Sequence, residues 1–312
     1  ALWVAISIIL IFMMQCGFLC LEVGFTRSKN NINVAIKNLA DFSIAALLFW
    51  LFGYAIMFGE SSYGLYGSSN FMLPLDGTDI WQPIIFLFQL MFCGTAVTIL
   101  SGAIAERIKF SGYIIITIWV AGIIYPLFGH WAWNGVYSTN TQGWLVALGF
   151  YDFAGSSVVH SLGGWAVLAI LLIIGPRIGR FSASGKSQKI RGNNIPLATI
   201  GVFFLWVGWL GFNAGSHLAF NVGTITTIFK TILAGSSALV SAILIGYYCY
   251  KKLDITLVLN SVLTGLVSIT ACVPVVSISS TILIGMIAGV IYMYIDHLLE
   301  KAQIDDAVGA IP

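Results

Sequence analysis

Charged side chains are scarce in this sequence. Asp, Glu, Lys and Arg make up 8% of its 312 residues, whereas hydrophobic residues make up 59%. A soluble domain carries roughly 25% charged residues, so this chain lacks the charge needed to cover a water-exposed surface. We therefore expect lipid to surround most of the protein. The formal net charge is only +2 and no basic patch is interleaved with aromatics, so we expect no nucleic acid as a partner.

Cysteine is also sparse, and its placement excludes several classes of protein. No pair of cysteines has metal-ligand spacing with a histidine partner, and all five lie within or at the ends of apolar runs. We interpret them as small buried apolar residues. The sequence also lacks a nucleophile–base pair, a metal cluster and a phosphate loop. We expect neither an enzyme nor a metal or cofactor. The cysteines are Cys16, Cys20, Cys93, Cys249 and Cys272.

Long apolar runs dominate what is present. A helix needs about 20 consecutive apolar residues to cross the hydrocarbon core of a bilayer. Runs of about this length recur along the chain, separated by Gly, Pro, Asn, Ser and charged residues that are typical of surface turns. The predicted fold is an all-α polytopic membrane bundle with nine spans in a single domain. The spans are 2–23, 38–59, 82–105, 113–129, 154–175, 195–216, 222–248, 255–273 and 279–299.

Lysine and arginine are confined to alternate connections between these spans. The connection 176–194 holds five of them, and Lys230 is the one exception to the alternation. Basic residues stay on the cytoplasmic side of a membrane. We therefore predict a protein of the cell membrane with its N-terminus outside the cell and the end of the chain in the cytoplasm. The connections without Lys or Arg are 60–81, 130–151, 217–221 and 274–278.

His160 is the most informative residue in a predicted span. Ionisable residues are costly inside a bilayer, so each is a candidate for function. A neutral imidazole there can line a pore and pass a proton or bind a guest, or it can be a core residue bonded to a neighbouring helix. The other histidines, His130, His217 and His297, lie at the ends of spans and are expected at the membrane interface.

Two aspartates precede similar turns, DFAG at Asp152 and DAVG at Asp306. Asp152 can cap the following helix through backbone N–H groups, or attract a cation to the outer side. The predicted orientation puts Asp152 near the outer face and Asp306 near the inner face. This is the arrangement of an inverted repeat, with halves of about 1–175 and 195–312.

Aromatic residues gather toward the predicted outer side. Phe92, Trp133 and Phe212 fall in the outer halves of their segments, where they either pack or bind a cation through their ring faces. Trp131 and Trp144, in the 130–151 connection, fit either an interfacial belt or an entrance vestibule.

Several stretches together resemble the Amt/Mep/Rh ammonium transporters, and the Amt branch more closely. They run from the first span to the last residue, and DFAG…VVH together with GFNAGS is especially specific. The matching stretches are LEVGFTRSKN (21–30), KNLADFS (37–43), GAIAERIKFS (102–111), GHWAWN (129–134), DFAGSSVVHSLGG (152–164), GWLGFNAGS (208–216) and IDDAVGAIP (304–312).

The resemblance implies a homotrimer in which each subunit has its own pore for ammonium, with methylammonium as an analogue. By motif, Phe92, Trp133 and Ser216 look like an outer recruitment site. Phe92 and Phe212 look like the gate below that site. His160, as the first of the family's paired pore histidines, and Trp209 look like the pore lining. Asp152 looks like the buried carboxylate near the recruitment site.

The resemblance leaves one departure and one choice. The family fold has eleven helices, and its second pore histidine follows GAIP, where this sequence ends at Pro312. Truncation before the last two helices is expected, and a nine-helix variant is the alternative. Relatives of this kind either transport ammonium or act as sensors that drive a cytoplasmic signalling domain, and fold alone does not decide between them.

Overall fold

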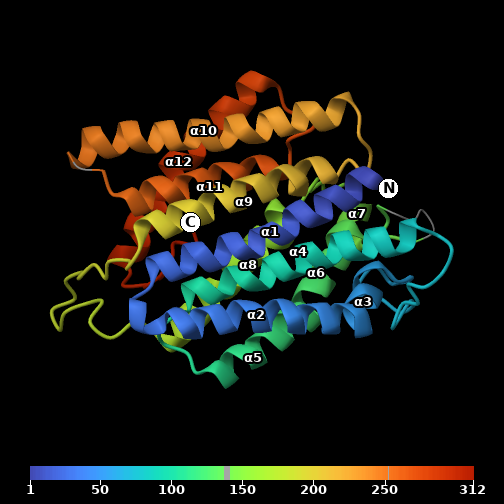
Figure 1. Ribbon diagram of the computed structural model, residues 1–312, viewed down its shortest axis with the longest axis horizontal. Helices are drawn as coiled ribbons and strands as arrows, with labels where there is room; N and C mark the ends of the chain where they lie inside the picture. The colour runs from blue at the N-terminus through green and yellow to red at the C-terminus, as the bar shows by residue number, and fades with distance from the viewer. Residues whose placement is uncertain (137–140, 252) are drawn as a thin grey trace.

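The computed structural model is a bundle of helices whose axes run roughly along one direction (Figure 1). The structure describes residues 1–136, 141–251 and 253–312, and for residues 249 and 250 it describes the backbone only. The predicted 130–151 connection therefore falls partly outside the described residues, as do Lys252 and the side chain of Cys249. The elements are α1 (Leu2–Phe25), η1 (Ser28–Asn30), α2 (Asn31–Leu48), η2 (Phe49–Gly53), α3 (Tyr54–Phe58), β1 (Ser61–Ser62), β2 (Tyr66–Gly67), α4 (Trp81–Ala103), α5 (Phe110–Trp119), η3 (Val120–Ile124), α6 (Tyr125–Trp133), α7 (Trp144–Ala147), η4 (Ser156–Ser161), α8 (Leu162–Ile174), α9 (Ile195–Gly215), α10 (Val222–Tyr250), α11 (Ile255–Thr270) and α12 (Ile278–Lys301).

The nine predicted spans all coincide with helical segments. Within the described part of the chain, eight of these are long and apolar enough to cross a bilayer. The remaining one, α11, has 16 residues. It is therefore about 24 Å long, shorter than the roughly 30 Å hydrocarbon core, and it packs among α9, α10 and α12. The predicted class, an all-α integral membrane bundle, is confirmed.

The second span begins earlier than predicted. We predicted a start at residue 38, because Asn30, Asn31, Asn33 and Lys37 interrupt the apolar run. In the structure α2 already begins at Asn31, and the Lys37 ammonium lies 5.4 Å from the centre of the Tyr113 ring. Packing against α5 therefore accommodates a charge that hydropathy alone places outside the span.

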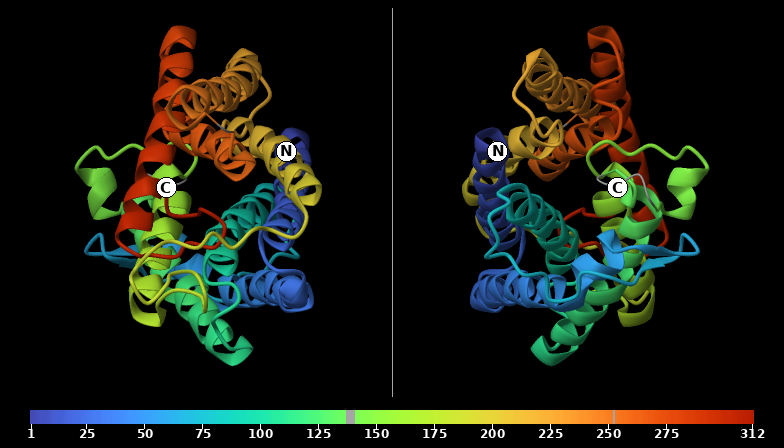
Figure 2. Two further views of the ribbon diagram at one scale, coloured as in Figure 1. Left: turned by 90° about the vertical axis from the view of Figure 1, so that its left-hand side faces the viewer. Right: turned by 90° about the vertical axis from the view of Figure 1, so that its right-hand side faces the viewer.

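The bundle has two ends, which we name by their sequence. The N-terminal face is the end where α1 begins, and the basic face is the end that carries the 176–194 connection (Figure 1). Figure 2 shows the basic face on the left and the N-terminal face on the right. A salt bridge of 2.9 Å from Lys189 to Asp254 puts the start of α11 at the basic face as well.

Close contact between α1 and α9 joins the two halves of the chain. Glycines line this contact, and a Cβ atom on Gly201 would lie 2.5 Å from the Leu21 nitrogen and 2.6 Å from the Gly17 oxygen. A Cβ atom on Gly208 would lie 2.1 Å from Met14 Cγ. Small residues at helix interfaces allow backbones to approach in this way, as is typical of membrane proteins.

Each half of the chain inserts an aspartate turn into the other half. After Asp152, the Phe153 nitrogen donates a hydrogen bond of 3.0 Å to the Ala271 oxygen, at the end of α11. After Asp306, the Ala307 nitrogen donates one of 3.4 Å to the Ala103 oxygen, at the end of α4. The two contacts lie at opposite faces, as inverted repeats require. The repeat boundaries, about 1–175 and 195–312, stay a prediction.

A buried cluster of ion pairs ties together the connections at the basic face. Arg177 donates hydrogen bonds of 2.8 and 2.9 Å to Asp305 through Nε and Nη2, and Arg27 pairs with Glu106. Burial raises the pKa of the Asp305 carboxyl, but the hydrogen bonds and charge of Arg177 outweigh it, so the net shift is downward. These arginines were predicted only to mark the cytoplasmic side, and their acidic partners were not predicted.

A short β-hairpin, β1–β2, folds over the N-terminal face and buries a histidine that we predicted at the interface. His130 is fully buried, with its Nε2 2.8 Å from Ser61 Oγ and its Nδ1 3.1 Å from the Met57 oxygen. The prediction for His130 was wrong because the hairpin covers the end of α6. Trp131 donates a hydrogen bond of 2.8 Å to Leu65 in the same hairpin, and its ring centre lies 5.9 Å from that of Trp144.

Candidate functional site

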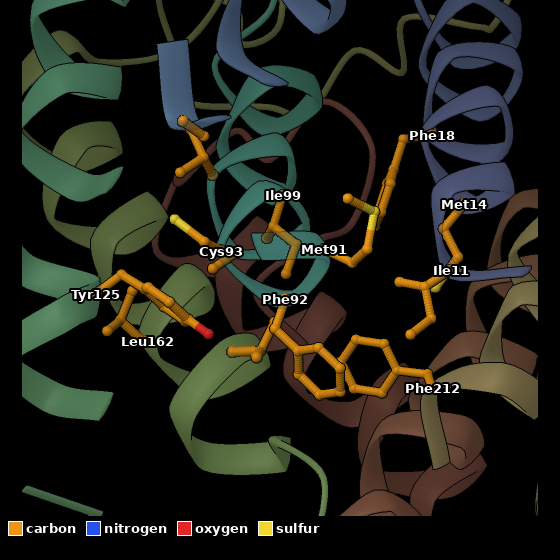
Figure 3. Packing of buried hydrophobic residues seen from close by; sticks show 14 of the residues in the cluster. Ile11, Met14, Phe18, Met91, Phe92, Cys93, Ile99, Tyr125, Leu162 and Phe212 are labelled. Carbon is orange, nitrogen blue, oxygen red and sulfur yellow. The ribbon is translucent and has the colours of Figure 1, made fainter. Parts of the chain in front are cut away.

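Two phenylalanine rings from different halves of the chain stack at the centre of the bundle. Phe92 of α4 and Phe212 of α9 have ring centres 4.0 Å apart and an interplanar angle of 25°. Figure 3 shows the two rings side by side. The exposed fractions of the two residues are 1% and 0%, so the stack is closed. Both residues were predicted as the gate, and the structure brings them together.

The aromatic contacts continue from this stack toward the basic face. Trp209 lies one turn from Phe212 on α9, with ring centres 5.9 Å apart. The His160 ring stacks on Trp209 at 4.7 Å and 14°, and it lies 5.5 Å from Phe212. His160 is buried, and its Nε2 atom has no hydrogen-bond partner within the described residues. This nitrogen is therefore available to a guest.

Trp133 lies on the other side of the stack, and Asp152 positions it. Its ring centre is 5.8 Å from that of Phe92, edge to face, and its Nε1 donates a hydrogen bond of 2.7 Å to the Asp152 backbone oxygen. Trp133 is buried, with 6% of its surface exposed.

The Asp152 carboxylate caps the helical segment that carries His160. Its Oδ1 accepts hydrogen bonds from the backbone nitrogens of Gly155 and Ser156, at 2.7 and 3.1 Å. Its Oδ2 accepts two more, from Ser157 at 2.8 Å and Val158 at 3.0 Å. Of the two roles left open for Asp152, the geometry therefore favours the cap, since both oxygens are engaged by backbone donors.

The capped segment is a π-helical turn, η4, and it ends at Ser161 directly after His160. Gly155 precedes it with φ 108°, a left-handed conformation that glycine adopts without strain. Ser156 fixes the turn to α11, because its Oγ donates to the Val267 oxygen at 2.6 Å and accepts from the Ala271 nitrogen at 2.7 Å. This positioning role of Ser156 was not predicted from the sequence.

Ser216, the third residue of the predicted recruitment site, ends α9. Its Oγ donates a hydrogen bond of 2.9 Å to the Phe212 oxygen, one turn earlier. This bond uses the hydroxyl proton and leaves the oxygen lone pairs free to accept a bond from a guest. The structure therefore puts Ser216 one turn from the stacked rings toward the N-terminal face.

A cavity of about 570 Å³ opens beside His160 and Trp209. Since α1 and α8 both run from the N-terminal face toward the basic face, Glu22 near the end of α1 lies farther toward the basic face than His160. The wall of this cavity is mostly apolar, with a few polar groups. The polar lining includes Glu22, Ser156, His160, Asn260, Thr264 and Ser268.

These features define a polytopic α-helical integral membrane protein with an aromatic column that leads into an internal cavity. The model of the Ammonium Transporter Family matches residues 1–312, and the chain belongs to this family. The predicted resemblance is confirmed. The family is described as one of transporters, in line with the expectation that this part of the protein is not an enzyme.

Curated relatives include two named as ammonium transporters. The chain is 46% identical to putative ammonium transporter sll0537 of Synechocystis, over 99% of this chain and 58% of that protein. It is 41% identical to ammonium transporter Amt2 of Archaeoglobus fulgidus, over 99% of this chain and 67% of the relative. The chain thus spans little more than half the length of the Synechocystis protein.

Solved structures share the fold. A structure described as a sensor Amt protein is 42% identical and superposes with a TM-score of 0.95, over 99% of this chain and 77% of that one. Mep2 of Candida albicans is 26% identical, with a TM-score of 0.88, over 99% of this chain and 68% of that one.

Proposed function

We propose that the protein moves ammonium across the membrane as ammonia and a proton, through a pore along the aromatic column. The observation that carries this proposal is the unbroken series of ring contacts from Trp133 through Phe92, Phe212 and Trp209 to His160. A bare cation is very unstable in such a low-dielectric passage, whereas neutral ammonia is not. The passage therefore favours deprotonation before entry.

Recruitment is the first step of this mechanism. Ammonium is held by the ring faces of Phe92 and Trp133 and by a hydrogen bond to Ser216 Oγ. Asp152 does not contact the guest, because it holds the turn and the Trp133 ring in place. Potassium has no N–H group to donate and no proton to release, so the same site discriminates against it.

Passage is the second step. Ammonia crosses between Phe92 and Phe212 and reaches the free Nε2 of His160, while the proton follows separately along the histidine. Imidazole suits this role because its two ring nitrogens can accept a proton and donate one. We also propose a homotrimer with one pore in each subunit, as the family resemblance implies.

A sensor is the second candidate function, supported by the TM-score of 0.95 to a structure described as a sensor Amt protein. A sensor binds ammonium at the N-terminal face and passes the signal to a cytoplasmic domain or partner. Uptake of labelled methylammonium into proteoliposomes tests both functions. Saturable uptake supports transport, and binding without uptake supports the sensor.

We further propose that the protein lies in the cell membrane with its basic face in the cytoplasm. The five basic residues of the 176–194 connection support this orientation. A cysteine introduced at the exposed Ser184 is expected to react with a membrane-impermeant maleimide only after permeabilisation. A cysteine at Thr78, exposed at the N-terminal face, is the matched control and is expected to react in sealed cells. The reverse pattern contradicts the orientation.

Replacing Trp133 with leucine is expected to weaken methylammonium binding by about 0.5–2 kcal/mol, because a cation–π contact is lost. Isothermal titration calorimetry on the purified protein measures this change. Trp131→Leu is the matched control, since Trp131 lies two residues away on α6 and contacts the hairpin instead of the stack. Equal affinities in both folded variants exclude Trp133 from the binding site.

A further inference from the structure

Glu22 is a buried carboxylate that the mechanism above does not use. It lies one turn before the end of α1, with 2% of its surface exposed. Its side chain passes close to α4 and to the turn after Asp306, because a Cβ atom on Gly102 would lie 2.8 Å from both Glu22 Cγ and Val308 Cγ2. It lines the same cavity as His160 and Trp209.

The neighbours of this carboxylate are neutral hydrogen-bond donors. Asn38 Nδ2 donates to Glu22 Oε2 at 2.8 Å and also to Ser101 Oγ at 3.0 Å, which places Ser101 beside the carboxylate. In the part of the chain that the structure describes, no salt bridge includes Glu22. The charged groups that face it are Lys37 and Asp41 of α2. The Lys37 ammonium is directed elsewhere, 3.5 Å from the Ile108 oxygen.

A buried carboxylate without an adjacent cation is unstable in its charged form. It becomes stable by holding a proton or by binding a cation. Glu22 has access to both, because it lines the same cavity as His160 and lies farther toward the basic face. Its place along the path is therefore where ammonia, having passed the stacked rings, must become ammonium again.

We propose that Glu22 is the internal acid that returns a proton to ammonia and then acts as the counter-ion of the ammonium formed. The ammonia lone pair takes the carboxyl proton, so an N–H bond forms as the O–H bond breaks. Ammonium then leaves toward the basic face, and the carboxylate regains the proton that was released at recruitment and passed along His160 into the shared cavity, so one proton crosses with each ammonia. This role rests on the proposed transport function.

Asp41, on the next helix α2, provides a matched control. It is also a fully buried carboxylate, but it accepts hydrogen bonds from Thr98 Oγ1 at 3.2 Å and from the Tyr113 hydroxyl. These two donors hold it among α2, α4 and α5, away from the cavity wall. Its role is to join helices, so Asp41→Asn is expected to lower the transport rate far less than Glu22→Gln, even though Asp41 faces Glu22.

The test compares Glu22→Gln, Glu22→Asp and Asp41→Asn in proteoliposomes, with rates normalised to folded protein. Glu22→Gln keeps the size and a hydrogen-bonding oxygen but has no proton to give. Its maximal rate of methylammonium uptake is expected to fall by about fivefold to tenfold, less than for a fully essential acid because water substitutes in part. The half-saturation concentration, set at the N-terminal face, is expected to stay unchanged. Glu22→Asp is expected to recover part of the rate.

The outcomes separate this role from a structural one and from the proposed function. A wild-type rate in Glu22→Gln overturns the proposal. So does an equal loss in Glu22→Asp and Glu22→Gln, because packing and not the acid then matters, and so does an equal loss in Asp41→Asn. If the wild-type protein itself takes up no methylammonium, the transport function fails and the role of Glu22 fails with it.

Discussion

The protein with Asp152 replaced by alanine is expected to be destabilised by about 3 kcal/mol or more. The carboxylate accepts four backbone hydrogen bonds at the start of η4, and each buried donor left without a partner costs about 1–3 kcal/mol. The turn also positions Trp133 through the Asp152 backbone oxygen. Methylammonium binding is therefore expected to weaken along with stability. Unfolding in detergent with increasing denaturant measures the first effect, and calorimetry measures the second.

Two further variants show whether capping is the cause. Asp152→Asn keeps one acceptor oxygen and is expected to fall between the wild type and the alanine variant. Asp79→Ala removes an exposed carboxylate that accepts a single hydrogen bond of 2.9 Å from the Trp81 nitrogen, so about 1 kcal/mol or less is expected. An alanine variant at Asp152 that is as stable as Asp79→Ala contradicts the capping role.

Replacing His160 with asparagine is expected to lower proton-coupled ammonium current on the order of 100-fold, the lower range for a positioned proton-transfer group. The amide stays polar but lacks a ring nitrogen that can take up and release a proton, so the proton has no relay. Stability is expected to change little, because His160 Nε2 makes no hydrogen bond to the described residues that the substitution breaks. Current across a planar bilayer, with ammonium and then potassium, measures both the flux and the selectivity.

His297→Asn is the matched control for this experiment. His297 is exposed near the end of α12, outside the aromatic column, and its replacement is expected to leave the current unchanged. If the protein is a sensor, His160→Asn is expected to alter signalling while binding at Trp133 persists. Wild-type current, selectivity and signalling in a folded His160→Asn protein assign His160 to packing alone.

The sequence predicts the spans well because their cause is local. A run such as 195–216 is apolar enough to prefer lipid whatever surrounds it, and α9 covers almost the same residues. The start of α2 was placed too late because Lys37 is accommodated by Tyr113, a residue of another helix. The burial of His130 by the β-hairpin depends in the same way on a distant segment.

The residues of the site were predicted from family motifs, and a functional candidate outside the motif-assigned roles, Glu22, was not predicted. Phe92, Phe212, Trp209 and His160 come from three segments that hydropathy does not bring together, and the resemblance supplied their grouping. The argument that selected His160 also applies to Glu22, since Glu22 is an ionisable residue inside the predicted span 2–23. Its hydrogen bond to Asn38 and its place on the cavity wall required coordinates.

The contact between Phe92 and Phe212 has a consequence for the energy supply of the cell. Two fully buried rings with centres 4.0 Å apart leave no room for a continuous file of water between them. Protons hop rapidly along such files, and a file open at both ends short-circuits the proton gradient. If the proposed transport function holds, a pore closed at rest by hydrocarbon rings does not conduct protons, so a cell can keep many copies in its membrane without discharging the proton gradient.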